Sequence, residues 1–109
     1  MTTRVYLIRH GATELSAEDR FAGAVDVLLS DTGRNQARLL GERLSRERIC
    51  AVYASPMKRT ISTAELVAEP HRLDVCPIDE LREIAHGRWE GKSRAEVARE
   101  YHEEYERWE

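Results

Sequence analysis

The sequence predicts an α/β fold in which helices alternate with the strands of a mainly parallel sheet. Apolar residues fill positions 5–8, and two shorter segments with strand-like composition lie at 51–54 and 73–77. Residues 30–47 lie between the first and second of these segments, and residues 55–69 lie between the second and third. Both stretches carry apolar residues at helical spacing. Strands separated by helices need crossover connections, which build a layered α/β sheet.

The first strand and the first long helix follow from local patterns. The continuous apolar run at residues 5–8 predicts a strand that is buried on both faces, as in a parallel sheet. After a long loop, Ser30 is a good N-cap, and Asp31 favours the first turn of a helix. A stripe of apolar and small residues marks the buried face of that helix: Ala37, Leu40, Gly41 and Leu44. Gly41 on this stripe predicts a close approach between the helix and the sheet.

The second strand, at residues 51–54, leads into the next helix. Ser55 can cap this helix, and Pro56 suits its first position. Its expected end is Pro70, because proline cannot continue a helix. Its expected buried face consists of Ile61, Ala64, Val67 and Ala68. Residues 73–77 then alternate in polarity and predict a third, shorter strand.

The last predicted element is one helix that runs from Ser93 to the end of the chain. The stretch "SRAE", at 93–96, is a capping-box pattern. An apolar stripe follows at helical spacing: Val97, Tyr101, Tyr105 and Trp108. With no internal repeat and no linker, residues 1–109 are expected to form a single domain.

Composition and charge exclude several classes of protein. Hydrophobic content of 41% and charged content of 34% are typical of a soluble globular domain. The net charge is −3, from 17 basic and 20 acidic residues, so no global positive field favours nucleic acid or an anionic membrane as a partner. The sequence contains no long apolar run and no secretory signal. We expect a cytoplasmic protein, with Cys50 and Cys76 as buried thiols and no disulfide between them.

An arginine and a histidine follow the first predicted strand, and a second arginine follows the next strand. Taken singly, Arg9, His10 and Arg59 are most simply solvated surface residues. Taken together they lie at the carboxyl edge of a parallel sheet, where ligands bind, and close to two helix starts that favour anions. An arginine fork binds phosphate oxygens, and a neutral histidine can act as a nucleophile. The pattern therefore favours a site for a phosphoryl group.

Four stretches in the same order resemble the histidine phosphatase superfamily, also called phosphoglycerate mutase-like. They are "LIRHGAT", "LLSDTGRNQARLLGERL", "YASPMKRTISTAELV" and "LREIAHGRWEG", and together they extend over nearly the whole chain. The resemblance implies a three-layer α/β/α domain with a mainly parallel sheet. It also implies an enzyme that transfers phosphoryl groups through a phosphohistidine, without metal or cofactor.

The resemblance implies a role for each matched residue. His10 would attack phosphorus, while Arg9 and Arg59 would hold the phosphoryl oxygens. Glu83 would protonate the leaving oxygen and then activate water, and Gly11 and Thr13 would complete the phosphate site. The "GRWEG" stretch resembles the phosphatase branches of the family, which favours hydrolysis of a small phosphorylated metabolite. Phosphoglycerate mutase-type transfer is the alternative.

The family's second pocket histidine, from an "SHG"-type motif, has no counterpart in this sequence. We therefore interpret the chain as the N-terminal portion of the family domain, incomplete at its C-terminus and without the C-terminal strands. Alone, it could be a phosphate-binding module with little or no turnover. Residues 5–8 would then form an exposed apolar edge, which predicts a homodimer, an exchange of elements between chains, or a longer parent chain that covers the edge.

Overall fold

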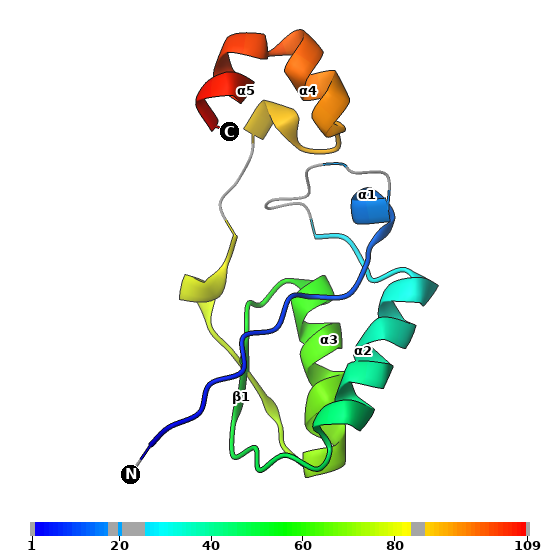
Figure 1. The fold of residues 1–109 in the computed structure, drawn as a ribbon, viewed down its shortest axis with the longest axis vertical. Helices are drawn as coiled ribbons and strands as arrows, with labels where there is room; N and C mark the ends of the chain where they lie inside the picture. The colour runs from blue at the N-terminus through cyan, green and yellow to red at the C-terminus, as the bar shows by residue number, and fades with distance from the viewer. Residues whose placement is uncertain (1, 18–19, 21–25, 84–86, 109) are drawn as a thin grey trace.

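The computed structural model describes residues 2–17, 20, 26–83 and 87–108. In these residues, helices and two strands follow one another (Figure 1). The α-helices and strands are α1 (Glu14–Ala17), α2 (Asp31–Leu44), β1 (Val52–Ala54), α3 (Lys58–Ala68), β2 (Val75–Pro77), α4 (Arg94–Glu100) and α5 (His102–Trp108). Three 3₁₀ helices are η1 (Glu69–His71), η2 (Asp79–Leu81) and η3 (Gly87–Trp89).

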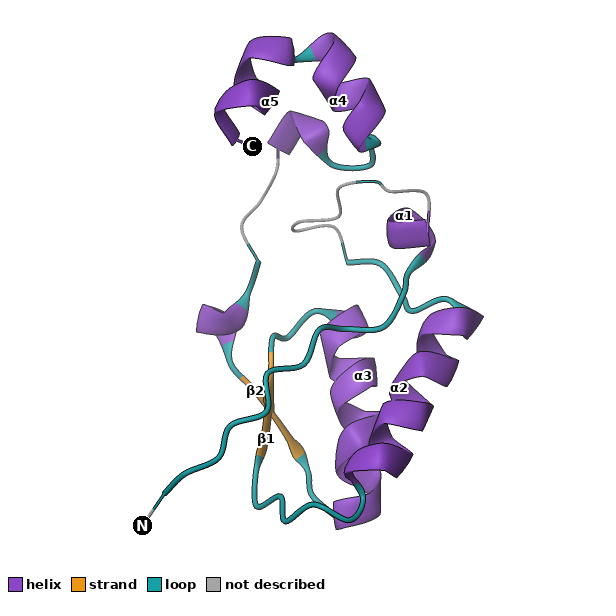
Figure 2. Ribbon diagram, viewed as in Figure 1, coloured by secondary structure: helices purple, strands orange, loops and turns teal. Residues whose placement is uncertain are grey.

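The two strands form a parallel pair that α3 connects. Val52 pairs with Val75, Tyr53 with Cys76 and Ala54 with Pro77. Helices α2 and α3 lie side by side next to this pair (Figure 2). The predicted α/β class with a parallel sheet is therefore confirmed, and the second and third strands are each slightly shorter than predicted.

Residues 5–8 lie in a described part of the chain and form no strand there, so the prediction of a strand is wrong. The segment has no assigned strand, and Leu7 is 93% exposed. The hydroxyl of Tyr6 in this segment donates a hydrogen bond to Glu47 Oε2 at 3.1 Å. An apolar run indicates that the side chains of a segment favour burial. A strand also requires a neighbouring backbone with which to form hydrogen bonds, and the run itself does not provide one.

Helix α2 starts where predicted, and three of the four residues predicted on its buried face, Ala37, Gly41 and Leu44, are buried, while Leu40 is half-buried. Ser30 Oγ accepts a hydrogen bond from the amide of Gly33 at 3.1 Å, as an N-cap should. A Cβ atom at Gly41 would lie 2.5 Å from the carbonyl oxygen of Leu66, which belongs to α3. The close approach predicted for Gly41 is therefore made to α3 and not to the sheet.

Helix α3 starts later than predicted. It begins at Lys58 with Met57 as its N-cap residue, so Ser55 is not the cap and Pro56 is not the first helical residue. The amide of Lys58 donates instead to Asp26 Oδ1 at 2.8 Å. A cap that comes from a distant loop leaves no local signal in the sequence. The predicted end holds, because α3 stops at Ala68 and Pro70 lies in the following 3₁₀ helix.

The last predicted helix is two helices with a break at Tyr101. Ser93 caps α4 as predicted, since its Oγ accepts from the amide of Glu96 at 3.1 Å. Tyr101 has φ −127° and ψ 47°, which ends α4 before α5 begins. The predicted stripe still packs together: Val97 and Trp89 form a buried cluster with Tyr101 and Tyr105 against it.

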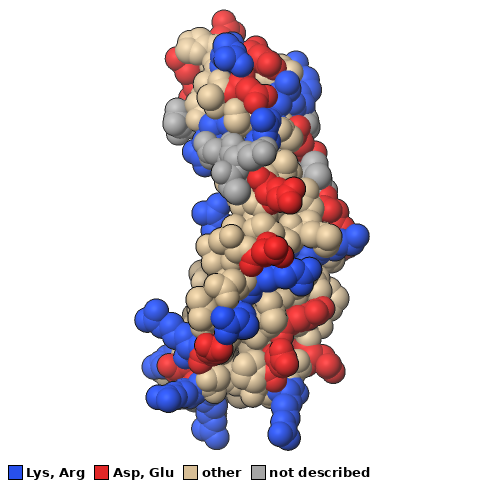
Figure 3. Space-filling view, turned by 90° about the vertical axis from the view of Figure 1, so that its right-hand side faces the viewer, with Lys and Arg blue, Asp and Glu red and all other residues tan. Residues whose placement is uncertain are grey.

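Arg20 joins this aromatic cluster to the N-terminal half of the chain. Its guanidinium lies 2.7 Å from the carbonyl oxygen of Gly91 and 3.0 Å from Glu96 Oε1. Cys50 and Cys76 are free as expected, but both are exposed rather than buried. Basic and acidic side chains are interspersed over the face shown in Figure 3. No helix in the described ranges is long and apolar enough to span a membrane.

Candidate active site

His10 lies in a short loop and is held by the backbone. Its Nδ1 atom is 2.7 Å from the carbonyl oxygen of Gly11. Because a carbonyl oxygen can only accept, Nδ1 must carry the proton in this contact. The neutral imidazole therefore keeps an unprotonated Nε2, whose lone pair can attack an electrophile.

Helix α2 holds one side of this loop. The carbonyl oxygen of Ala12 accepts from the amide and hydroxyl of Ser30, at 2.9 and 3.0 Å. The amide of Ala12 donates to Gln36 Oε1 at 2.9 Å. A Cβ atom on Gly11 would overlap the backbone of Gly33, and a Cβ on Gly33 would overlap Ala12. Both glycines are therefore needed for the loop to sit against the first turn of α2.

Helix α3 holds the other side of the loop. The amide of Gly11 donates to Thr63 Oγ1 at 3.1 Å, and Thr63 Oγ1 donates to the carbonyl oxygen of Arg59 at 2.8 Å. Both contacts are buried. The loop that carries His10 is thus attached to the helix that carries Arg59.

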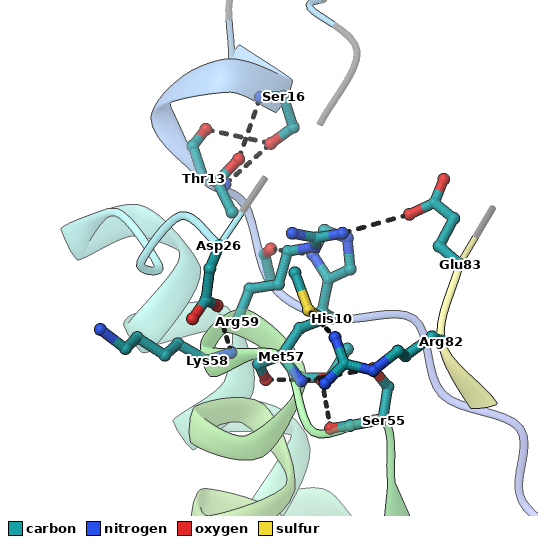
Figure 4. Close-up of polar contacts among 12 residues, drawn as sticks. His10, Thr13, Ser16, Asp26, Ser55, Met57, Lys58, Arg59, Arg82 and Glu83 are labelled. Carbon is teal, nitrogen blue, oxygen red and sulfur yellow. Dashed lines mark hydrogen bonds and ion pairs between the residues drawn. The ribbon is translucent and has the colours of Figure 1, made fainter. Parts of the chain in front are cut away.

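Arg59 and Glu83 form an ion pair beside this loop. Arg59 is only 1% exposed, and its Nη2 lies 3.3 Å from Glu83 Oε2. The Glu83 side chain is half-exposed and reaches over from the segment after η2. In Figure 4 the side chains of His10, Arg59 and Glu83 converge on one region above the start of α3. The site therefore combines an imidazole, a buried cation and a carboxyl group.

Comparison with known proteins identifies the family. A sequence model described as "Histidine phosphatase superfamily (branch 1)" matches residues 5–109. The chain belongs to the histidine phosphatase superfamily. It is 41% identical over 105 residues to phosphoserine phosphatase 1 of Hydrogenobacter thermophilus. This match covers 96% of this chain and 50% of that protein. It is also 36% identical over 109 residues to a 2,3-bisphosphoglycerate-dependent phosphoglycerate mutase of an Arthrobacter species, covering 95% and 44%.

Solved structures of the superfamily share the fold. Bacillus stearothermophilus YhfR superposes with a TM-score of 0.84 at 34% identity, over 92% of this chain and 50% of YhfR. A mycobacterial glucosyl-3-phosphoglycerate phosphatase in complex with VO3 gives a TM-score of 0.79 at 31% identity, over 83% and 43%. The architecture is therefore phosphoglycerate mutase-like, and the chain spans half the length or less of these relatives.

Two other expected site residues of this histidine phosphatase chain already have protein partners. The amide of Thr13 donates to Ser16 Oγ at 2.8 Å, and the amide of Ser16 donates to Thr13 Oγ1 at 3.1 Å. Thr13 is fully buried, and the amide of Gly11 is bound to Thr63. Their expected contacts with phosphate remain predictions. A bound phosphate would have to share or replace the hydrogen bonds seen here.

The two helix starts that were expected to favour an anion already have protein partners. Asp26 occupies the first amide of α3, and Ser30 occupies an amide in the first turn of α2. Protein groups therefore already accept from these two amides.

Arg9 is the expected site residue that no described hydrogen bond or ion pair connects to the others. It is exposed, and among the described residues no hydrogen bond or ion pair involves its side chain. It directly follows the extended segment 5–8, which no sheet holds in place. Its proposed role in binding phosphate remains a prediction.

Sequence reasoning missed three residues that shape the site: Asp26, Gln36 and Thr63. Thr63 left a signal, because it is a polar residue on the buried face of α3 four positions after Arg59. Asp26 and Gln36 left none, since each bonds to a backbone amide far away in the sequence.

Proposed function

We propose that this chain catalyses phosphoryl transfer from a small phosphorylated metabolite to His10, as part of phosphomonoester hydrolysis. One observation carries the proposal. The hydrogen bond from His10 Nδ1 to the carbonyl oxygen of Gly11 leaves Nε2 as the nucleophilic atom, on a loop fastened to the helix of the buried Arg59.

The reaction follows from these groups. The Nε2 lone pair attacks phosphorus, the bond to the leaving oxygen breaks, and Glu83 in its protonated form donates a proton to that oxygen. Arg59 offsets the charge on the phosphoryl oxygens, with Arg9 as a second ligand. Glu83 then takes a proton from water, which attacks the phosphohistidine and releases phosphate. This sequence needs no metal or cofactor.

Hydrolysis is favoured over mutase-type transfer. The "GRWEG" stretch, at residues 87–91, resembles the phosphatase branches. Two of the similar proteins are named for phosphoserine and glucosyl-3-phosphoglycerate phosphatases. Other relatives are named phosphoglycerate mutases, so transfer to a second acceptor is the alternative.

A second candidate function is phosphate binding with little turnover. It is supported by the buried Arg59 side chain, which could bind phosphate whether or not His10 is phosphorylated. In this case Arg59 would still bind phosphate, while the phosphohistidine would form or hydrolyse slowly.

The test separates the two functions by following His10 and Arg59 independently. The purified protein is incubated with phosphoramidate, and the phosphoenzyme is measured by intact mass. Phosphate affinity is measured by calorimetry. We expect base-stable, acid-labile labelling that is lost in His10→Ala, and phosphate binding that is lost in Arg59→Ala. Phosphate binding without labelling would favour the binding module, and labelling that persists without His10 would refute His10 as the nucleophile.

A further inference from the structure

The hydroxyl group of Thr63 lies between the loop of His10 and the backbone of Arg59. Its oxygen accepts a hydrogen bond from the Gly11 amide at 3.1 Å, and its proton is donated to the Arg59 carbonyl oxygen at 2.8 Å. Thr63 is buried, on the face of α3 that packs into the protein. It is therefore a polar side chain in the interior with two defined backbone partners.

The direction of each hydrogen bond follows from the groups involved. A hydroxyl has one proton to donate and lone pairs to accept with. The carbonyl oxygen of Arg59 can only accept, so the Thr63 proton points to it. The amide of Gly11 can only donate, so it donates to a lone pair of Thr63 Oγ1. A valine would match the shape of Thr63 but would leave the Gly11 amide without this acceptor.

Gly11 transmits this contact to the nucleophile. Its amide binds Thr63, and its carbonyl oxygen accepts from His10 Nδ1 at 2.7 Å. A series of three hydrogen bonds thus runs from the Arg59 carbonyl oxygen through Thr63 and Gly11 to the imidazole. Loss of the Thr63 acceptor would free the peptide unit between His10 and Gly11, which directly precedes the Gly11 carbonyl group that holds the His10 ring.

We propose that Thr63 is a positioning residue that sets the His10 imidazole relative to Arg59. This inference rests on the proposed function, since it assigns Thr63 to the same phosphoryl-transfer step. Thr63 does not need to touch the phosphoryl group, because it acts through Gly11. A displacement of a reacting group by about 1 Å lowers rates by about 10²-fold, which sets the expected effect.

The experiment compares Thr63→Val, which removes the acceptor, with Thr63→Ser, which keeps it. Thr60→Val is the matched control, because Thr60 is on the same helix and its hydroxyl binds the carbonyl oxygens of Ser55 and Met57 instead. For each protein we would measure three quantities: hydrogen exchange of the Gly11 amide, the rate of His10 labelling by phosphoramidate, and phosphate affinity. In the labelling step Nε2 bonds to phosphorus, the phosphorus–nitrogen bond of the donor breaks, and ammonia leaves.

The expected result is specific to Thr63→Val. Its Gly11 amide should exchange faster and its labelling should slow by about 10²-fold, while its phosphate affinity stays within about threefold of the parent, because Arg59 is unchanged. Thr63→Ser should restore labelling, and Thr60→Val should change none of the three quantities. Labelling of Thr63→Val at the parental rate would overturn the proposal. An equal loss of labelling in Thr60→Val, or a parallel loss of phosphate affinity, would overturn it as well.

A failure of the proposed function would be recognised separately. If the parent protein is not labelled on His10, that function fails, and the ¹⁵N shifts of the His10 ring decide the inference. Shifts that change in Thr63→Val and return in Thr63→Ser would support the positioning role. Shifts that are the same in all three proteins would refute it.

Discussion

The ion pair between Arg59 and Glu83 places a carboxylate where a phosphate oxygen is expected to bind. Arg59 is buried at 1% exposure, whereas Glu83 is 51% exposed and only 3.3 Å from the guanidinium. A cation in the interior needs a counter-charge or hydrogen bonds, so Glu83 stabilises Arg59 in the absence of a ligand. An incoming phosphate would take over this function, and Glu83 would have to move. In the proposed mechanism, the same side chain would compete with the phosphate and later donate a proton to the leaving group.

We expect Glu83→Gln to bind phosphate about two to five times more tightly than the parent, because an ion pair whose carboxylate is half-exposed is worth up to about 1 kcal/mol. Calorimetry at fixed pH and salt measures the affinity. Asp79→Asn is the control, since it removes one negative charge nearby from a carboxylate that pairs with Arg82 instead of Arg59, at 3.1 Å. An unchanged or weaker affinity in Glu83→Gln would show that Glu83 does not compete with phosphate for Arg59.

At the scale of elements, α2 and α3 hold the site between them. Ser30, Gly33 and Gln36 of the α2 end contact Ala12, and Thr63 of α3 contacts Gly11. The distance between the two helices therefore bears on the position of His10. Gly41 sets that distance farther along α2, where it lies against the backbone of Leu66.

We expect Gly41→Ala to destabilise the protein by about 1–3 kcal/mol. Helix propensity alone would stabilise this variant by about 1 kcal/mol. The new Cβ, however, would lie 2.5 Å from a backbone oxygen that cannot rotate away, so α2 and α3 would have to separate. Urea unfolding followed by circular dichroism measures the change, with Asn35→Ala on the exposed face of α2 as the control. A net gain in stability for Gly41→Ala would show that the helices separate at little cost.

The elements differ in how far the sequence could predict them. Helix α2 was predictable because Ser30 and the small-residue stripe act within one segment. The start of α3 was not, because Asp26 caps it from a distant loop. His10, Arg59 and Glu83 were found through motifs, and the structure brings the latter two into contact. Thr63 was missed although it is a polar residue on the buried face of α3, because its partner Gly11 lies in a loop 52 residues away.

The whole molecule is extended for its size. Its radius of gyration is 15.8 Å, and its extents are 47 × 32 × 19 Å. A compact domain of this length would have a radius of gyration of about 13 Å. Large apolar side chains remain exposed, among them Val5 at 71% and Leu7 at 93%. The backbone of this segment has no ladder partner among the described residues, so a second extended segment could pair with it.

We expect the protein to self-associate through residues 5–8. Pairing of this segment with its copy in a second molecule would bury Leu7 and its apolar neighbours and satisfy the exposed backbone groups. Sedimentation equilibrium over a tenfold concentration range should show a mass that rises from monomer towards dimer. Leu7→Glu should shift the protein towards monomer, because a charge on an edge opposes pairing. Leu39→Glu is the control, since Leu39 is 49% exposed on α2 and lies outside the segment. A parent protein that stays monomeric throughout, with protected amides along residues 5–8, would show that the segment is covered within one molecule.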